Sequence, residues 1–181
     1  MKVLVTGAAG FIGGQLWHTL WQRGDEVVGI DNFSYGNLDN LKFDDHDFGP
    51  EVRRMDIRDR EALPKLFEEE KFDVVYNIAG IAPLPDCQSD PVQAIEVNTL
   101  GLVNLLEAGR RTGIKQLVQA STNAMYENET EFPTVEGKFN PPTLIYPNTK
   151  YCGECFAQSF ADTYGMTVTC LRFANVYGPH I

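Results

Sequence analysis

Residues 2–13 of this 181-residue chain read KVLVTGAAGFIG, and this stretch decides the fold. Val3 to Val5 form a short aliphatic run, which is typical of a buried parallel strand. From Phe11 to Trp21, large apolar side chains recur at helical spacing, which predicts a helix with one packed face. The stretch therefore predicts a strand, a glycine-rich turn and a helix in direct succession.

The glycines of the turn, Gly7, Gly10 and Gly13, indicate a phosphate site. We expect Gly7 to make the tight turn, Gly10 to let the backbone approach the phosphates, and Gly13 to let the helix pack closely on the strand. The first amides of the helix that follows lie at the positive end of the helix dipole, where an anion is stabilised. The turn therefore predicts a bound pyrophosphate and, with it, a dinucleotide.

Length and composition limit what the chain can be. A length of 181 residues fits one domain, residues 1–181, with a sizeable core. The formal net charge of −10, from 25 acidic and 15 basic residues, argues against a nucleic-acid partner, because phosphate backbones require a basic face. No apolar run approaches the length of a membrane span or a signal-peptide core, so we expect a cytoplasmic protein without a membrane partner.

The four cysteines are Cys87, Cys152, Cys155 and Cys170. Cys152 and Cys155 form a Cys-x-x-Cys pair, a pattern found in redox sites and in half of a metal site. The chain has no second such pair and no suitably spaced histidines. We therefore predict no metal site and interpret these cysteines as reduced thiols on a helix face.

Strand and helix patterns alternate along the chain. Strands are expected at 2–5, 26–31, 51–55, 72–78, 114–120 and 167–173. After the opening helix, further helices are expected at 59–71, 91–111 and 146–164, and irregular loops at 34–50, 81–90 and 127–143. This alternation predicts an α/β fold with a doubly wound parallel sheet, the Rossmann fold.

The helix at 91–111 carries apolar residues at alternating steps of three and four, which predicts one continuous buried stripe made of Val92, Ile95, Thr99, Leu102 and Leu106. Asn98 lies beside that stripe. Its amide either faces something polar inside the protein or bonds to neighbouring backbone, and the sequence leaves both open.

Asp31 closes the second strand about 20 residues after the glycines, where this fold places its ribose-binding carboxylate. A carboxylate there accepts hydrogen bonds from the adenosine ribose and repels a 2′-phosphate. Because Asn32, Phe33 and Ser34 follow and no arginine does, the predicted cofactor is NAD rather than NADP. Asp56 follows the third strand, at the edge where ligands of open parallel sheets collect.

Tyr146 and Lys150 stand four residues apart, which puts a phenol and an ammonium on one helix face. A free tyrosine has a pKa near ~10 and is a poor base at neutral pH. We expect the Lys150 charge and an oxidised nicotinamide to lower the Tyr146 pKa toward working pH. Thr122, at the end of the fifth strand, can add a hydroxyl that orients a substrate oxygen.

Taken together, the motifs resemble the extended short-chain dehydrogenase/reductase superfamily, in its NAD-dependent sugar-nucleotide epimerase/dehydratase branch. They span the whole chain in the family's order. The motifs are TGAAGFIG at 6–13, DNFS at 31–34, DIRD at 56–59, NTLG at 98–101, Ser121-Thr122 with Tyr126, Tyr146 with Lys150, and RFANVYGP at 172–179.

The resemblance implies a role for each matching residue. Tyr146 would be the acid/base, Thr122 its hydroxyl partner on the substrate side, and Lys150 a ligand of the nicotinamide ribose. Asn175 would meet the sugar nucleotide. The implied NAD-binding residues are Gly7, Gly10, Phe11, Ile12, Gly13, Asp31, Asn32, Ser34, Asp56, Ile57, Ala79, Gly80, Asn98, Tyr146, Lys150 and Phe173.

Two departures from the family pattern narrow the reaction. Family 4,6-dehydratases carry an Asp-Glu pair after the catalytic threonine, where this chain has Asn123 and Ala124, so dehydration by that route is disfavoured. Asn77 stands where the branch usually has His, which we interpret as a minor variation. Epimerisation requires only hydride removal, rotation of the ketone and hydride return, so a UDP-hexose 4-epimerase is the leading hypothesis.

The chain is also shorter than its family. Members run to roughly twice this length, so the C-terminal lobe that holds the sugar nucleotide is expected to be absent. We therefore expect NAD binding with little turnover, from either a fragment or a naturally truncated protein. Alternatives are a sugar-nucleotide dehydrogenase, reductase or dehydratase, and a non-catalytic NAD-binding module. The resemblance further implies a homodimer through helices 91–111 and 146–164.

Overall fold

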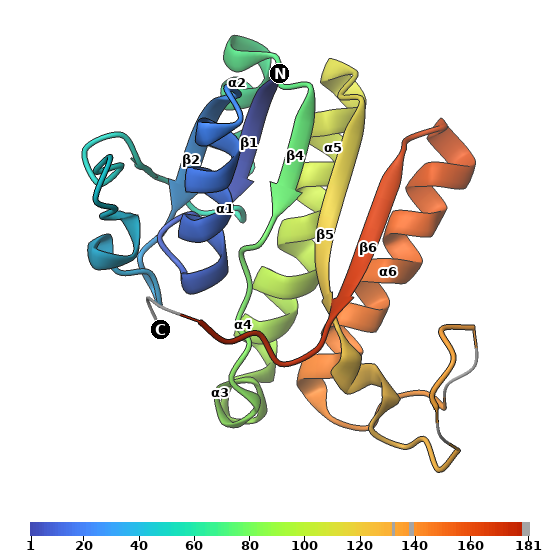
Figure 1. Cartoon of the computed structure of the whole chain (residues 1–181). Coiled ribbons are helices and arrows are strands. Elements are labelled where there is room, and N and C mark those ends of the chain that lie inside the picture. The colour runs from blue at the N-terminus through green and yellow to red at the C-terminus, as the bar shows by residue number, and fades with distance from the viewer. Residues whose placement is uncertain (132, 138–139, 179–181) are drawn as a thin grey trace.

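The computed structural model describes residues 1–131, 133–137 and 140–178 (Figure 1). Its strands are β1 (Lys2–Thr6), β2 (Glu26–Asp31), β3 (Arg53–Arg54), β4 (Val74–Asn77), β5 (Gln116–Thr122) and β6 (Val168–Phe173). Its α-helices are α1 (Phe11–Gln22), α2 (Ala62–Glu70), α3 (Leu84–Ser89), α4 (Pro91–Ile95), α5 (Gly101–Thr112) and α6 (Ile145–Tyr164). A π-helical turn covers Glu96–Leu100, and 3₁₀ turns cover Leu38–Leu41 and Asn123–Tyr126.

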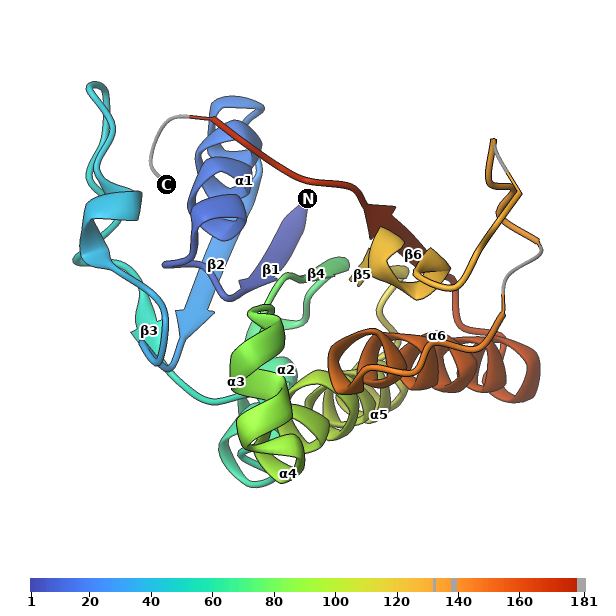
Figure 2. The same ribbon diagram turned by 90° about the horizontal axis from the view of Figure 1, so that it is seen from below.

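The strands described form a single sheet in the order β3-β2-β1-β4-β5-β6, and all of its pairings are parallel. The order reverses between β1 and β4, so the crevice at their carboxyl ends is the point where an open α/β sheet binds its ligand. Helix α1 covers one face of the sheet, and α2, α5 and α6 cover the other (Figure 2). The predicted doubly wound parallel sheet is therefore confirmed.

Each face of the sheet has its own apolar core. On the face covered by α2 and α5, the sheet residues Leu4, Val75 and Leu117 pack in one cluster with Leu102 and Leu106 of α5.

Against α1, the core contains Val3, Val5 and Trp17, whose ring stacks on Phe48 at 5.0 Å between centroids. A Cβ at Gly29 would lie 1.9 Å from the Trp17 ring, so that strand position has no room for a side chain. The loop after β2 is thus fixed on α1, beside the glycine turn.

The predicted stripe along 91–111 is wrong in its first part. Thr99, Leu102 and Leu106 are buried, but Val92 and Ile95 are 65% and 51% exposed. The cause is the π turn at Glu96–Leu100, because an i→i+5 turn inserts an extra residue and rotates the preceding residues off the buried face.

Other element boundaries differ from expectation for local reasons. The predicted loop 81–90 contains α3, which tolerates Pro83 as N-cap and Pro85 in its first turn because amides there need no intrahelical partner. Strand β3 has only two residues. Helix α2 begins after Asp59, whose Oδ1 accepts from the amides of Glu61 and Ala62 at 2.9 Å. Along the described residues, none of the helices combines the length and apolarity needed to cross a bilayer.

Candidate active site

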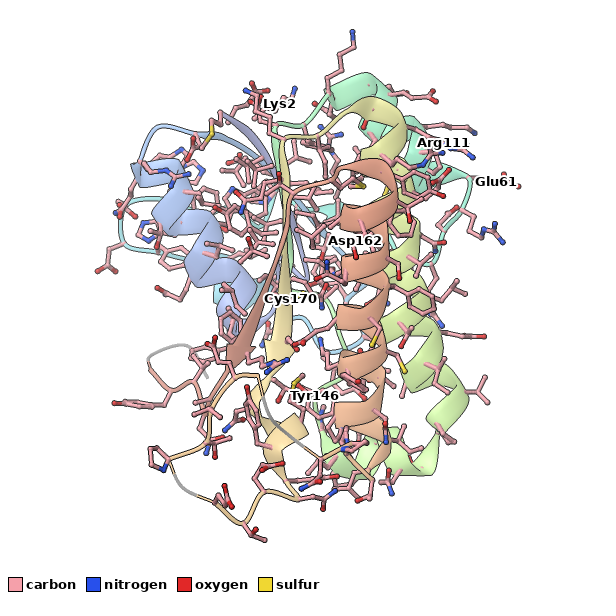
Figure 3. The ribbon with its side chains drawn as sticks, turned by 90° about the vertical axis from the view of Figure 1, so that its right-hand side faces the viewer. Lys2, Glu61, Arg111, Tyr146, Asp162 and Cys170 are labelled. Carbon is pink, nitrogen blue, oxygen red and sulfur yellow. The ribbon has the colours of Figure 1, made fainter. Side chains whose placement is uncertain are left out.

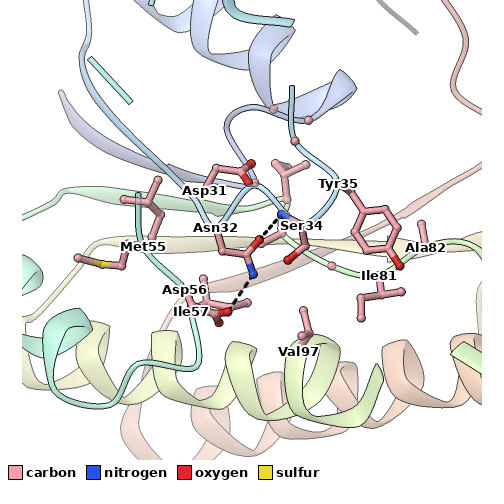
Figure 4. Close-up of a pocket in the computed structure, with 18 of the residues that line it drawn as sticks. Asp31, Asn32, Ser34, Tyr35, Met55, Asp56, Ile57, Ile81, Ala82 and Val97 are labelled. Carbon is pink, nitrogen blue, oxygen red and sulfur yellow. Dashed lines mark hydrogen bonds between the residues drawn. The ribbon is translucent and has the colours of Figure 1, made fainter. Parts of the chain in front are cut away.

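A cavity of about 330 Å³ opens at the carboxyl ends of β1, β2 and β4 (Figure 4). This volume lies in the range of small-molecule sites. The cavity brings together most of the residues expected to bind the cofactor: Gly7, Gly10, Phe11, Ile12, Gly13, Asp31, Asn32, Ser34, Asp56, Ile57, Ala79 and Gly80. It is also lined by residues that sequence reasoning did not single out, among them Tyr35, Arg58 and Val97.

The glycine turn has no space for side chains. Gly7 has φ +65, and a Cβ there would lie 2.7 Å from the Ala79 amide nitrogen. A Cβ at Gly13 would lie 2.0 Å from the Gly7 carbonyl oxygen. Helix α1 then starts with Gly10 as its N-cap, so its first-turn amides open into the cavity beside bare backbone. This is a cradle for a phosphate group.

Asp31 ends β2 and is buried at the cavity wall. Its Oδ2 accepts from the Ala9 amide at 2.9 Å and its Oδ1 from the Phe33 amide at 2.7 Å. The carboxylate thus holds the glycine turn in place, and each oxygen has further lone-pair capacity for a ligand hydroxyl.

Asp56 is held by two partners at the far end of the cavity. Arg58 donates to its Oδ2 through Nη2 at 2.9 Å, and Asn32 donates to the same oxygen at 2.8 Å (Figure 4). These hydrogen bonds, that from Arg58 above all, lower the pKa of Asp56 to about 2. Asn32 in turn accepts from the Ser34 amide at 2.9 Å. The resulting edge is polar and fixed.

Asn77, the position where the family usually has His, belongs to a buried polar chain across the sheet. Its Oδ1 accepts from the Thr6 hydroxyl at 2.6 Å, and its Nδ2 donates to Gln119 Oε1 at 2.7 Å. The Thr6 oxygen also accepts from the Ala79 amide at 3.2 Å. An amide side chain can both accept and donate here, so Asn77 fixes the floor of the cavity.

Lys150 is a buried cation beside the cavity. Its Nζ donates to the Ala120 carbonyl at 3.0 Å, and a Cβ at Gly80 would lie 3.0 Å from it. Burial lowers its pKa to about 8. The absence of a side chain at Gly80 therefore leaves the ammonium within reach of a ligand at the cavity edge.

Tyr146 lies in the first turn of α6, at the end of the helix that lies beside the end of β5 (Figure 3). A hydrogen bond with Thr122 lowers its pKa, but burial has the larger effect, and the net pKa is raised above the ordinary value of 10.0. The predicted lowering of the Tyr146 pKa by Lys150 is therefore wrong. A phenol surrounded by Ile81, Cys87 and Ala94 is desolvated, and desolvation disfavours the phenolate.

Helix α6 is fastened to the end of β5 by three side chains spaced four residues apart. Tyr146 bonds to Thr122, Lys150 to the Ala120 carbonyl, and Glu154 accepts from the Ser121 hydroxyl at 2.5 Å. Glu154 also pairs with Arg172 of β6 at 2.7 Å. These contacts set the relative positions of the Tyr146 and Thr122 hydroxyls.

The remaining expected residues lie around this centre. The Asn98 amide bonds to both the N–H and the C=O of Ile81, at 2.8 and 3.0 Å, and donates to Thr149 at 3.0 Å. Asn98 therefore holds the loop after Gly80, and its side-chain oxygen and nitrogen are both hydrogen-bonded to protein groups. Phe173 pairs with Thr122 in the sheet, and Asn175 is exposed after β6. Pro179 of the last motif lies outside the described residues.

The cysteines occupy separate places. Cys152 and Cys155 are exposed on α6, and Cys87 is buried, with its thiol donating to the Ile81 carbonyl at 3.4 Å. Burial raises the Cys87 pKa. Among the residues that the structure describes, no group of three or more His, Cys, Asp or Glu is placed to hold a metal ion.

Burial of the Lys150 ammonium lowers the free energy of unfolding at neutral pH. Its pKa is about 8 when folded and 10.5 ordinarily, so the unfolded chain binds more protons between these pH values. Stability should therefore rise with pH through this window, by up to about 3 kcal/mol. We expect Lys150→Met to unfold at higher denaturant than wild type near neutral pH, with the difference shrinking toward pH 10.5. A variant less stable than wild type at every pH would contradict this.

The chain matches known proteins in sequence and in overall fold. The NAD dependent epimerase/dehydratase family matches residues 3–180. UDP-glucuronate 4-epimerase 2 of Arabidopsis thaliana is 36% identical over 99% of this chain and 43% of its own length. Two UDP-glucose 4-epimerase structures cover 99% of this chain and 57% of theirs: that from Thermotoga maritima with UDP-glucose (TM-score 0.92, 33% identity) and that from Thermus thermophilus with NAD (TM-score 0.90, 36% identity).

The chain spans about half the length of the curated relatives it matches. Within that half, the match runs from the first strand to the segment after β6 and includes every motif around the cavity. The chain belongs to the NAD-dependent epimerase/dehydratase family.

Proposed function

We propose that the chain provides the cofactor-binding and proton-transferring half of a sugar-nucleotide 4-epimerase that acts on a UDP-hexose. The observation that carries the proposal is the Tyr146–Thr122 hydroxyl pair beside the buried Lys150 ammonium. The relatives support the substrate class, since they are named as UDP-glucose and UDP-glucuronate 4-epimerases.

NAD is the cofactor of this family, and the cavity fits it. Gly7 and Gly13 let the turn pack closely against Ala79 and α1, and the first-turn amides of α1 would bind the pyrophosphate. Asp31 would accept from the adenosine ribose hydroxyls, and Asp56 would contact the adenine. Lys150 would donate to the nicotinamide ribose. Bound there, NAD supplies a hydride acceptor that can return the hydride.

In the proposed reaction, the Tyr146 oxygen takes the proton of the sugar 4-hydroxyl as the hydride leaves the same carbon. Thr122 donates a hydrogen bond to that sugar oxygen and keeps it oriented toward the Tyr146 oxygen. After the ketone has rotated in the site, Tyr146 would return the proton to the sugar oxygen. Because Lys150 does not lower the Tyr146 pKa in the structure, the positive charge that favours the phenolate would come from the oxidised nicotinamide.

The other reactions of the family have less support. Asn123 and Ala124 follow Thr122 in a 3₁₀ turn, and neither can act as an acid or a base. This argues against dehydration. Net oxidation or reduction remains a second candidate, because the same Tyr146 and Lys150 serve it equally well.

The test separates the two reactions. The NAD-loaded chain is used at a concentration comparable to that of UDP-glucose. The incubation is long enough to detect slow turnover. We expect UDP-galactose without net accumulation of reduced nicotinamide. Accumulation of reduced nicotinamide with an oxidised sugar would favour a dehydrogenase, and NAD binding with no conversion would favour a non-catalytic module.

We further propose that two copies pair through α4, the π turn and α6. These segments contact one another and carry exposed large apolar side chains, Val92, Ile95, Leu100 and Phe156. Such a patch is typical of a protein–protein interface.

Burying a charge in this patch should break the pair. We expect Ile95→Glu to be monomeric by light scattering at concentrations where the wild type is dimeric. The matched control is Val135→Glu, which changes another exposed apolar residue outside these segments. A monomeric wild type, or a dimeric Ile95→Glu, would contradict the interface.

A further inference from the structure

Tyr35 and Asp86 connect two segments that are far apart in sequence. Tyr35 follows Ser34 in the loop after β2, and Asp86 is in α3, after β4. The Tyr35 hydroxyl donates to Asp86 Oδ2 at 2.6 Å. This bond to a carboxylate, assisted by burial, raises the pKa of Tyr35 to about 12. The phenol therefore stays protonated and able to donate to Asp86 through the neutral range.

The bond joins the two rims of the cavity. Tyr35 and Gly36 line it on the β2 side, and Ile81 and Ala82, just before α3, line it on the β4 side. Strand β1 and its glycine turn lie between β2 and β4. Figure 4 shows the Tyr35 ring reaching across, with its hydroxyl toward Ile81 and Ala82. A ligand lying on the glycine turn would pass beneath this contact.

The β2 rim is anchored to the fold. Gly36 packs so closely that a Cβ would lie 2.8 Å from Asp31 Oδ1 and 2.9 Å from the Ala9 Cβ. The next amide, that of Asn37, donates to the Ala9 carbonyl at 2.9 Å. The backbone that carries Tyr35 is therefore fixed to the glycine turn.

The β4 rim is anchored as well. Cys87, next to Asp86, is fully buried, and Gln88 accepts from the Ile145 amide of α6 at 2.9 Å. The Tyr35 side chain itself is 54% exposed. It can rotate outward without disturbing either core, so it is the part of the contact that is free to move.

We propose that the Tyr35–Asp86 hydrogen bond is a strap over the dinucleotide site and sets the rate at which the cofactor enters and leaves. This rests on the NAD site of the proposed function. The contact lies within the chain and forms whether or not a ligand is below it, so it slows association and dissociation together. A reaction that restores its own cofactor in every cycle needs no such exchange.

This gives the strap a kinetic signature. Removing it should raise the association and the dissociation rate constants for NAD by similar factors, leaving the dissociation constant almost unchanged. A residue that only touches the cofactor would instead alter dissociation and affinity. A residue that only supports the fold would alter stability.

The test uses NAD as the probe, with stopped-flow protein fluorescence to follow both rates in Tyr35→Phe, Asp86→Ala and the double variant. Loss of one largely exposed hydrogen bond should raise each rate roughly two- to tenfold. The double variant should match the single ones, because both remove the same contact. Tyr164→Phe and Asp162→Ala, which remove a tyrosine hydroxyl and a carboxylate on α6, should leave both rates unchanged. Denaturant unfolding confirms that each variant is folded.

Rates unchanged in the single variants would overturn the strap, as would faster dissociation with unchanged association. In both cases NAD still binds, and the proposed function stands. A wild-type chain that binds no NAD would overturn both together.

Discussion

Replacing Tyr146 with Phe is expected to leave NAD affinity within a few-fold of wild type while lowering sugar epimerisation by about 10²- to 10⁴-fold. The ring would keep its packing against Ile81, Cys87 and Ala94. Only the hydroxyl that bonds to Thr122 would be lost, and with it the group that takes the sugar proton. Conversion is measured with the NAD-loaded chain and UDP-glucose, and NAD binding by calorimetry.

Two further variants make this result specific. Tyr164→Phe removes a hydroxyl from the opposite end of α6 and should convert UDP-glucose at the wild-type rate. Thr122→Val removes the partner hydroxyl and should also slow conversion, without the full loss. Equal conversion by wild type and Tyr146→Phe would refute the assigned acid/base.

Gly13→Ala is expected to abolish NAD binding and to lower the free energy of unfolding by at least about 3 kcal/mol. The added Cβ would lie 2.0 Å from the Gly7 carbonyl oxygen and 2.8 Å from its carbon. Both neighbours are backbone in the turn that would hold the pyrophosphate, so relief requires α1 to move away from the turn. Denaturant unfolding and NAD titration measure the two effects.

The matched control is Gly137→Ala. A Cβ there meets open space, so its stability should stay within about 0.5 kcal/mol of wild type. Gly13→Ala with wild-type NAD affinity would show that the turn does not contact the cofactor.

The sheet could be predicted from sequence because its signals are local. Short stretches predict their own structure: the aliphatic run Val3 to Val5 predicts a strand, and the glycines from Gly7 to Gly13 predict the turn. Asp31 is recognised by its distance from those glycines, and strands and helices alternate regularly along the chain. The same spacing predicted that the glycines and Asp31 would share one cavity. Parallel strands deliver their carboxyl ends to one edge, so this convergence follows from topology alone.

The remainder depends on contacts between distant residues. The π turn at Glu96–Leu100 exposes Ile95, and the spacing of apolar residues in the sequence does not predict that the helix contains an extra residue there. Tyr35 lines the cavity because Asp86, 51 positions later, accepts its hydroxyl. The only local signal was an aromatic residue directly after Ser34. Residues that act through such a partner are not visible in one sequence.

Electrostatics could not be predicted from spacing either. The four-residue separation of Tyr146 and Lys150 predicts mutual influence, but burial dominates the pKa of both groups. The phenol pKa is raised and the ammonium pKa is lowered, as desolvation requires. Lowering of the phenol pKa is therefore expected to depend on the positive charge of the oxidised cofactor.

The proposed function requires that the hydride removed from the sugar carbon returns to that same carbon. The most direct measurement uses UDP-glucose with deuterium at carbon 4 and the NAD-loaded chain. We expect UDP-galactose that keeps its deuterium at carbon 4, with none in the solvent and none in released cofactor. Deuterium lost to water, or left in released reduced cofactor, would contradict it.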